Sequence, residues 1–298
     1  MAASMVGGRH NWPVAATPRD AAWPLLAAAL WGGMYVVSRL TFHAIPPVTL
    51  GLARLLIGAG VLLLALRRLP ALGDRRLAGL GALLAGTLML QFWGTALAGA
   101  AAGSLLTLLT PVFVAIGAPL LLREPTGGRQ WAGIAIALGG ALLVSGGGTG
   151  SSAFGDLLLV GSAATWGAYT VLGAPLVRRI GALEITTGAS LWALPMMLPG
   201  TILELASGQR FDPSLPALAG ALYLGVFATA LAWWAWYRGV QRLPAVTTAV
   251  FFLAQPVVGI ALSVPIFRQP IGAAFIAGSI LVAAGMLLAS GWSPLRRR

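Results

Sequence analysis

The chain has 298 residues, 58% of them hydrophobic and only 9% charged, which excludes a soluble domain of this length because a soluble surface needs more charged side chains. All nineteen basic residues are arginine and cysteine is absent, so the sequence excludes a Schiff-base lysine, disulfides and thiolate metal sites. The net charge of +12 would suggest nucleic acid in a soluble protein, but here the arginines stand in short connections between apolar segments, which indicates membrane orientation instead.

Ten apolar segments are candidates for transmembrane helices, each of which needs about 20 residues. We expect spans within residues 21–41, 47–66, 77–98, 102–122, 131–146, 156–176, 185–205, 215–237, 244–266 and 271–291. With cytoplasmic termini, fifteen of the nineteen arginines lie on the inner side, against Arg39, Arg210 and Arg268 outside and Arg54 within the second span. This asymmetry follows the positive-inside rule and predicts an all-α, multi-pass protein of the bacterial inner membrane.

Two spans carry a tryptophan and a tyrosine near their centres, where a purely structural apolar helix does not require them. Trp31 and Tyr35 share one face of the first span, and Trp166 and Tyr169 share one face of the sixth. We interpret both pairs as an aromatic wall for a flat or apolar group, with helix packing as the alternative. Further candidates for binding a substrate by hydrogen bonds or aromatic surface are Gln91, Thr107, Tyr223, Phe227 and Gln255.

Arg54 is the one charged residue well inside a predicted span, about 10 Å below the start of its helix at Pro47. A charge at this depth is costly and is therefore a candidate for function. It could hold a substrate carboxylate or pair with Asp156 or Glu204, and we favour a structural or gating role. All seven acidic residues lie at helix ends or in connections, which argues against proton coupling through a carboxylate at the midplane.

Two other groups of residues predict how helices sit in the membrane. Next to Arg238, the eighth span ends in an aromatic cluster that we expect to anchor it at the interface, namely Trp233, Trp234, Trp236 and Tyr237. In the fifth span a ladder of small residues predicts close packing against another helix, namely Gly133, Ala137, Ala141 and Ser145.

The chain also contains an internal repeat. Residues that recur 145 positions later are Pro111, Arg123, Pro125, Gly133, Gly140, Leu142, Ser145 and Gly146, and Trp31-Gly32 recurs 135 positions later as Trp166-Gly167. Two halves of five spans each must cross the membrane in opposite directions, which predicts an inverted-topology repeat. We divide the chain into a cytoplasmic segment (1–20), a first repeat (21–146), a linker (147–155), a second repeat (156–292) and a basic cytoplasmic tail (293–298).

These features together resemble the drug/metabolite transporter superfamily, and most closely its bacterial ten-helix EamA-type exporters. The resemblance covers residues 22–292 and rests on the "LWG" and "TWG" motifs, Arg54, Pro111 and Pro256, and the "REP" and "RQP" turns. It implies a plasma-membrane carrier that exports small metabolites, among which amino acids, including aromatic ones, are prominent. The halves differ in that Gln269 stands at the position of Glu124.

We therefore expect an exporter of neutral apolar or aromatic amino acids that works by alternating access and needs neither a cofactor nor a metal. Its partners would be the small-molecule substrate and the lipid bilayer, without nucleic acid, and its oligomeric state stays open. Pro111 and Pro256 would act as hinges that gate the two ends. The alternatives are an exporter of other metabolites or lipophilic drugs, a channel, and a membrane enzyme, for which the sequence offers little catalytic chemistry.

Overall fold

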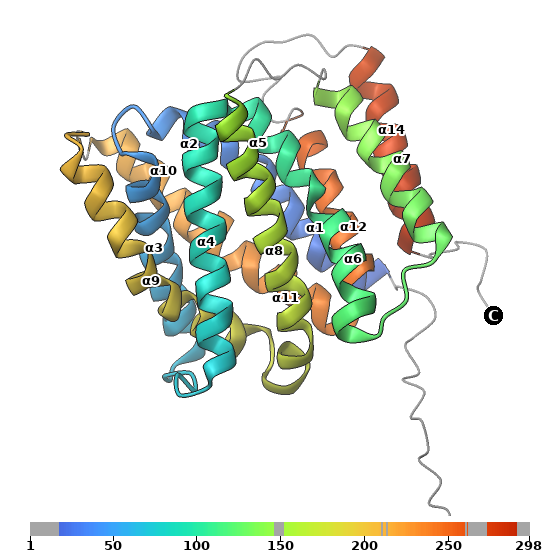
Figure 1. Cartoon of the computed structure of the whole chain (residues 1–298), viewed down its shortest axis with the longest axis horizontal. Helices are drawn as coiled ribbons and strands as arrows, with labels where there is room; N and C mark the ends of the chain where they lie inside the picture. The colour runs from blue at the N-terminus through green and yellow to red at the C-terminus, as the bar shows by residue number, and fades with distance from the viewer. Residues whose placement is uncertain are drawn as a thin grey trace, which may run out of the picture.

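The computed structural model describes residues 18–145, 152–209, 211–212, 214–259, 261 and 273–290. Residues 1–17 of the predicted N-terminal segment, most of the linker, the end of the ninth span and the basic tail lie outside these residues. Where the chain is described, all of its regular elements are helices, as expected for an all-α protein. Figure 1 shows them as a bundle of helices whose axes are roughly parallel.

The helices of the first half are α1 (Pro18–Gly32), α2 (Met34–Thr41), α3 (Pro47–Leu66), α4 (Arg75–Ala98), α5 (Ala100–Leu106), the 3₁₀ turn η1 (Thr107–Leu109), α6 (Thr110–Leu122) and α7 (Gly128–Ser145). Those of the second half are α8 (Ala153–Ile180), α9 (Ala182–Ala206), α10 (Leu215–Gly225), the π-helical η2 (Val226–Leu231), α11 (Ala232–Arg242), α12 (Ala245–Val250), the 3₁₀ turn η3 (Phe251–Ala254) and α14 (Ala273–Ser290).

Seven helical segments among the described residues are long and apolar enough to cross a membrane. Two further apolar segments, Ala245–Gly259 and Ile276–Ala289, are shorter within the described part of the chain. Helix is present in each of the ten ranges expected from the sequence. The number of ten spans and the cytoplasmic position of the termini remain predictions.

The glycines of the two "WG" motifs allow neighbouring helices to approach closely. A Cβ atom on Gly32 would lie 2.9 Å from the nitrogen of Gly259 and 3.0 Å from the carbonyl oxygen of Gln255. A Cβ atom on Gly167 would lie 2.9 Å from Cβ of Phe113. Side chains do not tolerate contacts this short, so glycine at both positions lets the first helix of each half pack against a helix of the other half.

Helices α7 and α14 pack side by side along the right-hand edge of the bundle in Figure 1. Gly133 and Ala137 are buried in this contact: a Cβ atom on Gly133 would lie 2.7 Å from Cβ of Ala289, and one on Gly285 would lie 2.7 Å from Cβ of Ala137. The predicted close packing of the small-residue ladder is confirmed for these two residues, and Ala141 is also buried.

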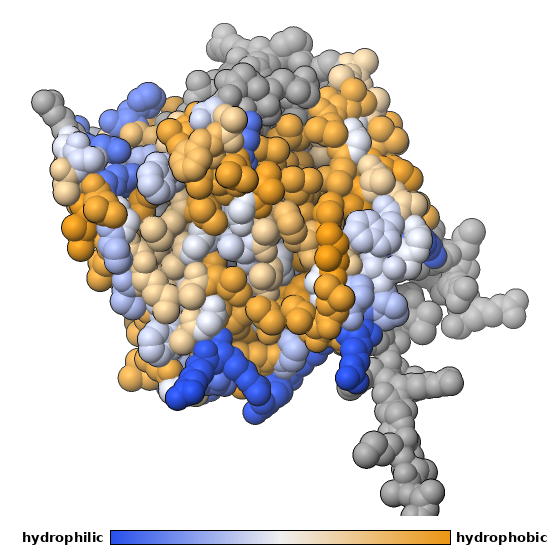
Figure 2. Space-filling model, in the orientation of Figure 1, coloured by the Kyte–Doolittle hydropathy of each residue, from blue (hydrophilic) through white to orange (hydrophobic). Residues whose placement is uncertain are grey.

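Hydrophilic side chains gather at the ends of the bundle. Figure 2 shows a wide hydrophobic band, with hydrophilic groups along its lower edge and a smaller group at the upper left. The connections that follow α3, α6 and α8 lie at the lower end in Figure 1. These connections and the adjoining helix ends carry Arg67, Arg68, Arg75, Arg76, Arg123, Arg129, Arg178 and Arg179. The positive-inside rule describes this distribution for a cytoplasmic end.

Candidate functional site

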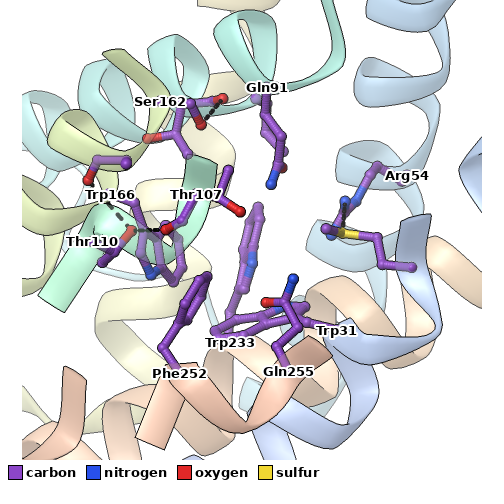
Figure 3. Close-up of a pocket in the computed structure, with 14 residues that line it drawn as sticks. Trp31, Arg54, Gln91, Thr107, Thr110, Ser162, Trp166, Trp233, Phe252 and Gln255 are labelled. Carbon is purple, nitrogen blue, oxygen red and sulfur yellow. Dashed lines mark hydrogen bonds between the residues drawn. The ribbon is translucent and has the colours of Figure 1, made fainter. Parts of the chain in front are cut away.

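A cavity of about 30 Å³ lies inside the bundle, where helices of both halves meet (Figure 3). It is lined by Trp31, Met34, Arg54, Thr87, Leu88, Gln91, Thr107, Thr110, Ser162, Ala163, Trp166, Trp233, Phe252 and Gln255. This volume suits one or two water molecules, whereas sites that enclose a small organic ligand measure roughly 300 Å³ or more. The cavity is therefore contracted in this conformation and would have to widen to admit an amino acid.

Aromatic rings from both halves form one wall of the cavity. The rings of Trp31 and Trp166 meet edge to face, with centroids 5.4 Å apart and an interplanar angle of 89°. Phe252 lies 5.3 Å from Trp31, and Trp233 lies 6.1 Å from Trp166. These separations are typical of favourable aromatic contacts, so the wall is a packed unit and not four independent rings.

The structure corrects our interpretation of the aromatic cluster at the end of the eighth span. Trp233, Trp236 and Tyr237 are at most 3% exposed and lie in the core, so they are not interfacial anchors. Trp236 donates a hydrogen bond to Thr170 (3.1 Å), and the Tyr237 hydroxyl donates to the carbonyl of Tyr169 (2.7 Å). The physical reason is that α11 continues to Arg242, which places these residues more than a turn deeper than a span ending at residue 237.

Trp234 differs from its three neighbours, because it points about 100° away from Trp233 around the axis of α11. It is partly buried, and its ring contacts Trp23 of α1 edge to face at 5.2 Å. The guanidinium of Arg238 lies 5.7 Å from the Trp234 ring. An aromatic ring beside a cation at a helix end is what we expected of an anchor.

Polar side chains connect three helices next to the cavity. The hydroxyls of Tyr35 and Thr107 are hydrogen-bonded at 2.8 Å, and the amide of Gln91 donates to the Tyr35 hydroxyl at 3.0 Å. Gln91 and Thr107 line the cavity, whereas Tyr35 lines a smaller adjoining space of about 10 Å³. Tyr35 therefore holds two lining groups in place, a different position from the one we predicted for it.

Two lining residues carry buried polar atoms that make no hydrogen bond with any described residue. Gln255 is 1% exposed, and neither its amide nitrogen nor its amide oxygen makes a hydrogen bond of ordinary geometry, although the amide lies close to the Tyr35 hydroxyl. The indole nitrogen of Trp166 is in the same situation. Figure 3 shows the side chains of Gln255 and Gln91 pointing toward each other across the cavity. An unpaired buried polar group costs about 1–3 kcal/mol, so these atoms are suited to bind a ligand.

Arg54 lines the cavity from α3 and is 1% exposed. Its Nε donates to the Thr229 hydroxyl (2.8 Å), its Nη2 donates to the Ala228 carbonyl (2.8 Å), and its Nη1 contacts the Met34 sulfur (2.9 Å). All three partners are electrically neutral. The positive charge is thus solvated by the protein but not neutralised by these contacts.

The π-helical segment η2 supplies the partners of Arg54. In a π segment the backbone amides bond five residues back, so the regular α-helical pattern is interrupted. The Ala228 carbonyl accepts hydrogen bonds from both Arg54 and the indole of Trp31 (2.9 Å). The Thr229 hydroxyl in turn donates to the carbonyl of Leu224 (2.8 Å), five residues earlier. The irregular helix therefore positions two functional candidates at once.

The ion pairs suggested for Arg54 are not formed with any described residue. The carboxylate of Glu204 instead accepts hydrogen bonds from the backbone amides of Val48 (3.0 Å) and Thr49 (2.7 Å). These amides lie in the first turn of α3, where backbone N–H groups have no partner within the helix. Pairing with Glu204 is thus wrong for this conformation, because that carboxylate caps α3.

The structure does not bring every candidate to the cavity. Tyr169 is fully buried behind Trp166, with ring centroids 5.1 Å apart. Tyr223 and Phe227 contact each other on the outer face of the eighth span, and Phe227 is 45% exposed. We expected this pair to line the cavity and the expectation is wrong for this conformation, because the inward face of that helix is formed by Ala228 and its neighbours.

Several lining residues were not predicted from the sequence, and Trp233 and Phe252 are the aromatic ones among them. Phe252 precedes Gln255 by three residues, so helical spacing alone would have placed both on one face. Met34, Thr87 and Ser162 carried no comparable signal, since small polar or flexible side chains are common in packed helices.

Pro111 and Pro256 occupy equivalent positions after 3₁₀ turns. Pro111 is the second residue of α6, directly after η1, and Pro256 stands two residues after η3. Proline fits the first turn of a helix because its missing N–H needs no partner there. Both prolines therefore begin α-helical segments, and their role as hinges remains a prediction.

The chain is similar to known transporters over nearly its whole length. The model of the EamA-like transporter family matches residues 21–146 and 153–291. YetK, an uncharacterized transporter of Bacillus subtilis, is 30% identical over 281 residues, which cover 86% of this chain and 84% of YetK. A probable terminal-alkyne amino-acid exporter of Streptantibioticus cattleyicolor is 28% identical over 281 residues, covering 90% and 93%. One crystal structure shares the fold, with a TM-score of 0.76, 22% identity and coverage of 92% of this chain and 97% of that one.

Proposed function

The chain belongs to the EamA-like transporter family, and from this premise we propose that it exports small amino acids with apolar or aromatic side chains by alternating access. It is a multi-pass transporter of the bacterial inner membrane. The observation that carries the proposal is the cavity, whose lining combines an aromatic wall with amide and hydroxyl groups. An amino acid needs both kinds of surface, since its side chain is apolar and its backbone groups are polar.

Equivalent contacts in the two halves support the inverted repeat that alternating access requires. Gly32 lies against Gly259, and Gly167 lies against Phe113 and Val114. Val114 precedes Gly259 by 145 residues, the offset at which the sequence repeats. The family model also matches two segments, one in each half of the chain. Transporters built in this way hold their substrate between the repeats, near the middle of the membrane.

The charge of the lining favours amino acids over lipophilic cations. None of the residues that line the cavity in the described part of the chain is acidic, and Arg54 adds a positive charge. A cation in this cavity would meet an unneutralised guanidinium in a medium that screens it weakly. The similarity to a probable amino-acid exporter points the same way. The lack of an acid among these lining residues also supports transport without a proton-carrying carboxylate at the midplane.

The direct test is efflux of radiolabelled phenylalanine from liposomes that contain the purified protein, with no pH gradient or voltage. We expect saturable efflux, reduced at least about fivefold by Trp31→Ala or Trp166→Ala, because each change removes aromatic contact with the substrate. Trp131→Ala is the matched control, since Trp131 is a partly exposed tryptophan of α7 that does not line the cavity. Its efflux should equal that of the wild type.

The same assay separates the parts of the proposal. Efflux that appears only after a pH gradient is imposed would keep the carrier and overturn transport without proton coupling. No efflux of any amino acid under either condition would instead favour another metabolite or a drug. A substitution of Pro111 or Pro256 by alanine that leaves the efflux rate unchanged would count against the hinges.

A further inference from the structure

Arg54 presents an energetic problem that the neutral contacts around it do not solve. Its side chain is 1% exposed and forms no ion pair with a described residue. A buried charge is stabilised well only when an opposite charge or strong hydrogen bonds replace the water that it has lost. The rings of Phe92 and Trp233, 5.5 and 5.8 Å from Cζ, provide only weak cation–π stabilisation. A bound anion would therefore stabilise the guanidinium of Arg54.

The hydrogen-bonding capacity of Arg54 is only partly used. A guanidinium has five N–H groups, and three of them point to partners in the protein. One of these partners is the thioether of Met34, which is a weak acceptor. A carboxylate that replaced this sulfur would accept two parallel hydrogen bonds, in the geometry that arginine and carboxylate prefer.

Two further unpaired groups face the same cavity. The amide of Gln255 could accept from an ammonium group or donate to a carboxylate, and the Trp166 indole can donate. The rings of Trp31, Trp166 and Trp233 line the same cavity as these groups and Arg54 (Figure 3). One ligand with a carboxylate next to an apolar group could bind to Arg54 and to these polar groups through hydrogen bonds and to the aromatic rings through its apolar part.

We propose that Arg54 is the substrate-binding residue that holds a carboxylate of the transported molecule, in exchange for its contact with Met34. The inference rests on the proposed function and narrows it, because the substrate must be a carboxylic acid with an apolar or aromatic group. A phosphate suits the site less well, since its second charge would need donors beyond the three N–H groups of Arg54 that are available once the Met34 contact is released. The carboxylate can belong to an amino acid or to a simple organic acid.

The test compares two pairs of ligands by titration calorimetry on the purified full chain in detergent. Each pair differs only in its acid or amide group: L-phenylalanine with L-phenylalaninamide, and 3-phenylpropanoate with 3-phenylpropanamide. We expect each acid to bind about 10- to 100-fold more tightly than its amide, as for loss of a charged hydrogen-bonded group. Arg54→Gln should remove this preference and Arg54→Lys should retain part of it. Arg76→Gln, an exposed arginine of α4 outside the cavity, should leave it intact.

The outcomes distinguish the inference from the proposed function. Equal binding of acid and amide in both pairs would overturn the role of Arg54 and leave an amino-acid carrier. A preference for 3-phenylpropanoate without binding of phenylalanine would support the carboxylate site and contradict amino-acid export. Binding of none of the four ligands would count against both. If Arg54→Gln does not fold, the preference of the wild-type protein decides the question alone.

Discussion

At the scale of single residues, the two adjacent tryptophans of α11 show how depth and helix face decide a role. Trp233 lines the cavity and lies 5.8 Å from the Arg54 guanidinium, whereas Trp234 faces Trp23 at the helix end. Both are tryptophans, and they are adjacent in the sequence. A difference of about 100° around the helix axis therefore separates a candidate binding residue from a packing residue.

Replacing these tryptophans one at a time tests this assignment. Trp233→Leu should raise the substrate concentration for half-maximal efflux by about fivefold or more, because it removes a ring from the cavity wall. Trp234→Leu should leave that concentration unchanged, although it loses the contact with Trp23. Thermal unfolding of both variants controls for misfolding. An equal effect of the two changes on efflux would show that the cavity wall does not include Trp233.

The candidate site could be predicted from the sequence only in part. Polar or aromatic residues at mid-span stood out against an apolar background, and this signal led to Trp31, Gln91, Thr107, Trp166 and Gln255, which line the cavity. Arg54 also lines the cavity, although we favoured a structural or gating role for it. Trp233 and Phe252 gave no such signal, because the first stands near an arginine and the second in an apolar run. Their place depends on where the helix ends and which face turns inward.

At the scale of helices, hydropathy predicted the positions of the membrane spans well. It did not predict where these helices contain π or 3₁₀ segments. Each range expected for a span contains helix, because a backbone in hydrocarbon must bond internally. Hydropathy gives no signal for the π segment η2 or for the 3₁₀ turns η1 and η3, and η2 contacts Trp31 and Arg54, which are distant in the sequence. The partners of Arg54 come from η2, so the site depends on the least predictable element.

Packing of α7 against α14 gives a prediction with a matched control one residue away. A Cβ atom on Gly140 would lie 2.6 Å from the Gly278 carbonyl oxygen and 2.8 Å from the Val282 nitrogen. A Cβ atom on Gly139 would meet no described atom within 4 Å. Gly140→Ala should destabilise the protein by about 1–3 kcal/mol, because the two backbones must move apart. Gly139→Ala should be neutral or slightly stabilising, since alanine favours helix.

Thermal unfolding of the two alanine variants in the same detergent provides the measurement. The melting temperature of Gly140→Ala should fall by several degrees relative to Gly139→Ala. Equal melting temperatures would show that α7 and α14 separate more easily than the structure indicates.

At the scale of the whole molecule, a carrier must break and remake contacts between its halves. Glu124, which follows α6, makes such a contact at the predicted cytoplasmic end. Its carboxylate accepts hydrogen bonds from Arg178 of α8 (3.0 Å) and from the backbone amide of Ala245 at the start of α12 (3.0 Å). It thereby joins the first half to two helices of the second. Its repeat position carries glutamine, so a contact through a carboxylate is available to only one half.

This asymmetry predicts that Glu124→Gln shifts the protein toward a conformation open to the cytoplasm. The amide can still accept a hydrogen bond but loses its charge, and an ion pair of this kind contributes about 1 kcal/mol. The open population should therefore rise about three- to tenfold. The natural chain has no cysteine, so a single Thr170→Cys on α8, below the aromatic wall, can report opening by its rate of thiol labelling in inside-out vesicles.

The decisive comparison is with Asp74→Asn, which also neutralises a carboxylate at the predicted cytoplasmic end. Asp74 caps its own helix through the amide of Arg76 (2.9 Å), a local contact within the first half. If the contact between the halves controls opening, Glu124→Gln should accelerate labelling of Thr170→Cys while Asp74→Asn leaves the rate unchanged. Equal acceleration in both variants would mean that loss of charge at this end matters, but not the contact that joins the halves. No acceleration in either variant would mean that closure depends on the packed aromatic residues Trp236 and Tyr237 instead of the ion pair.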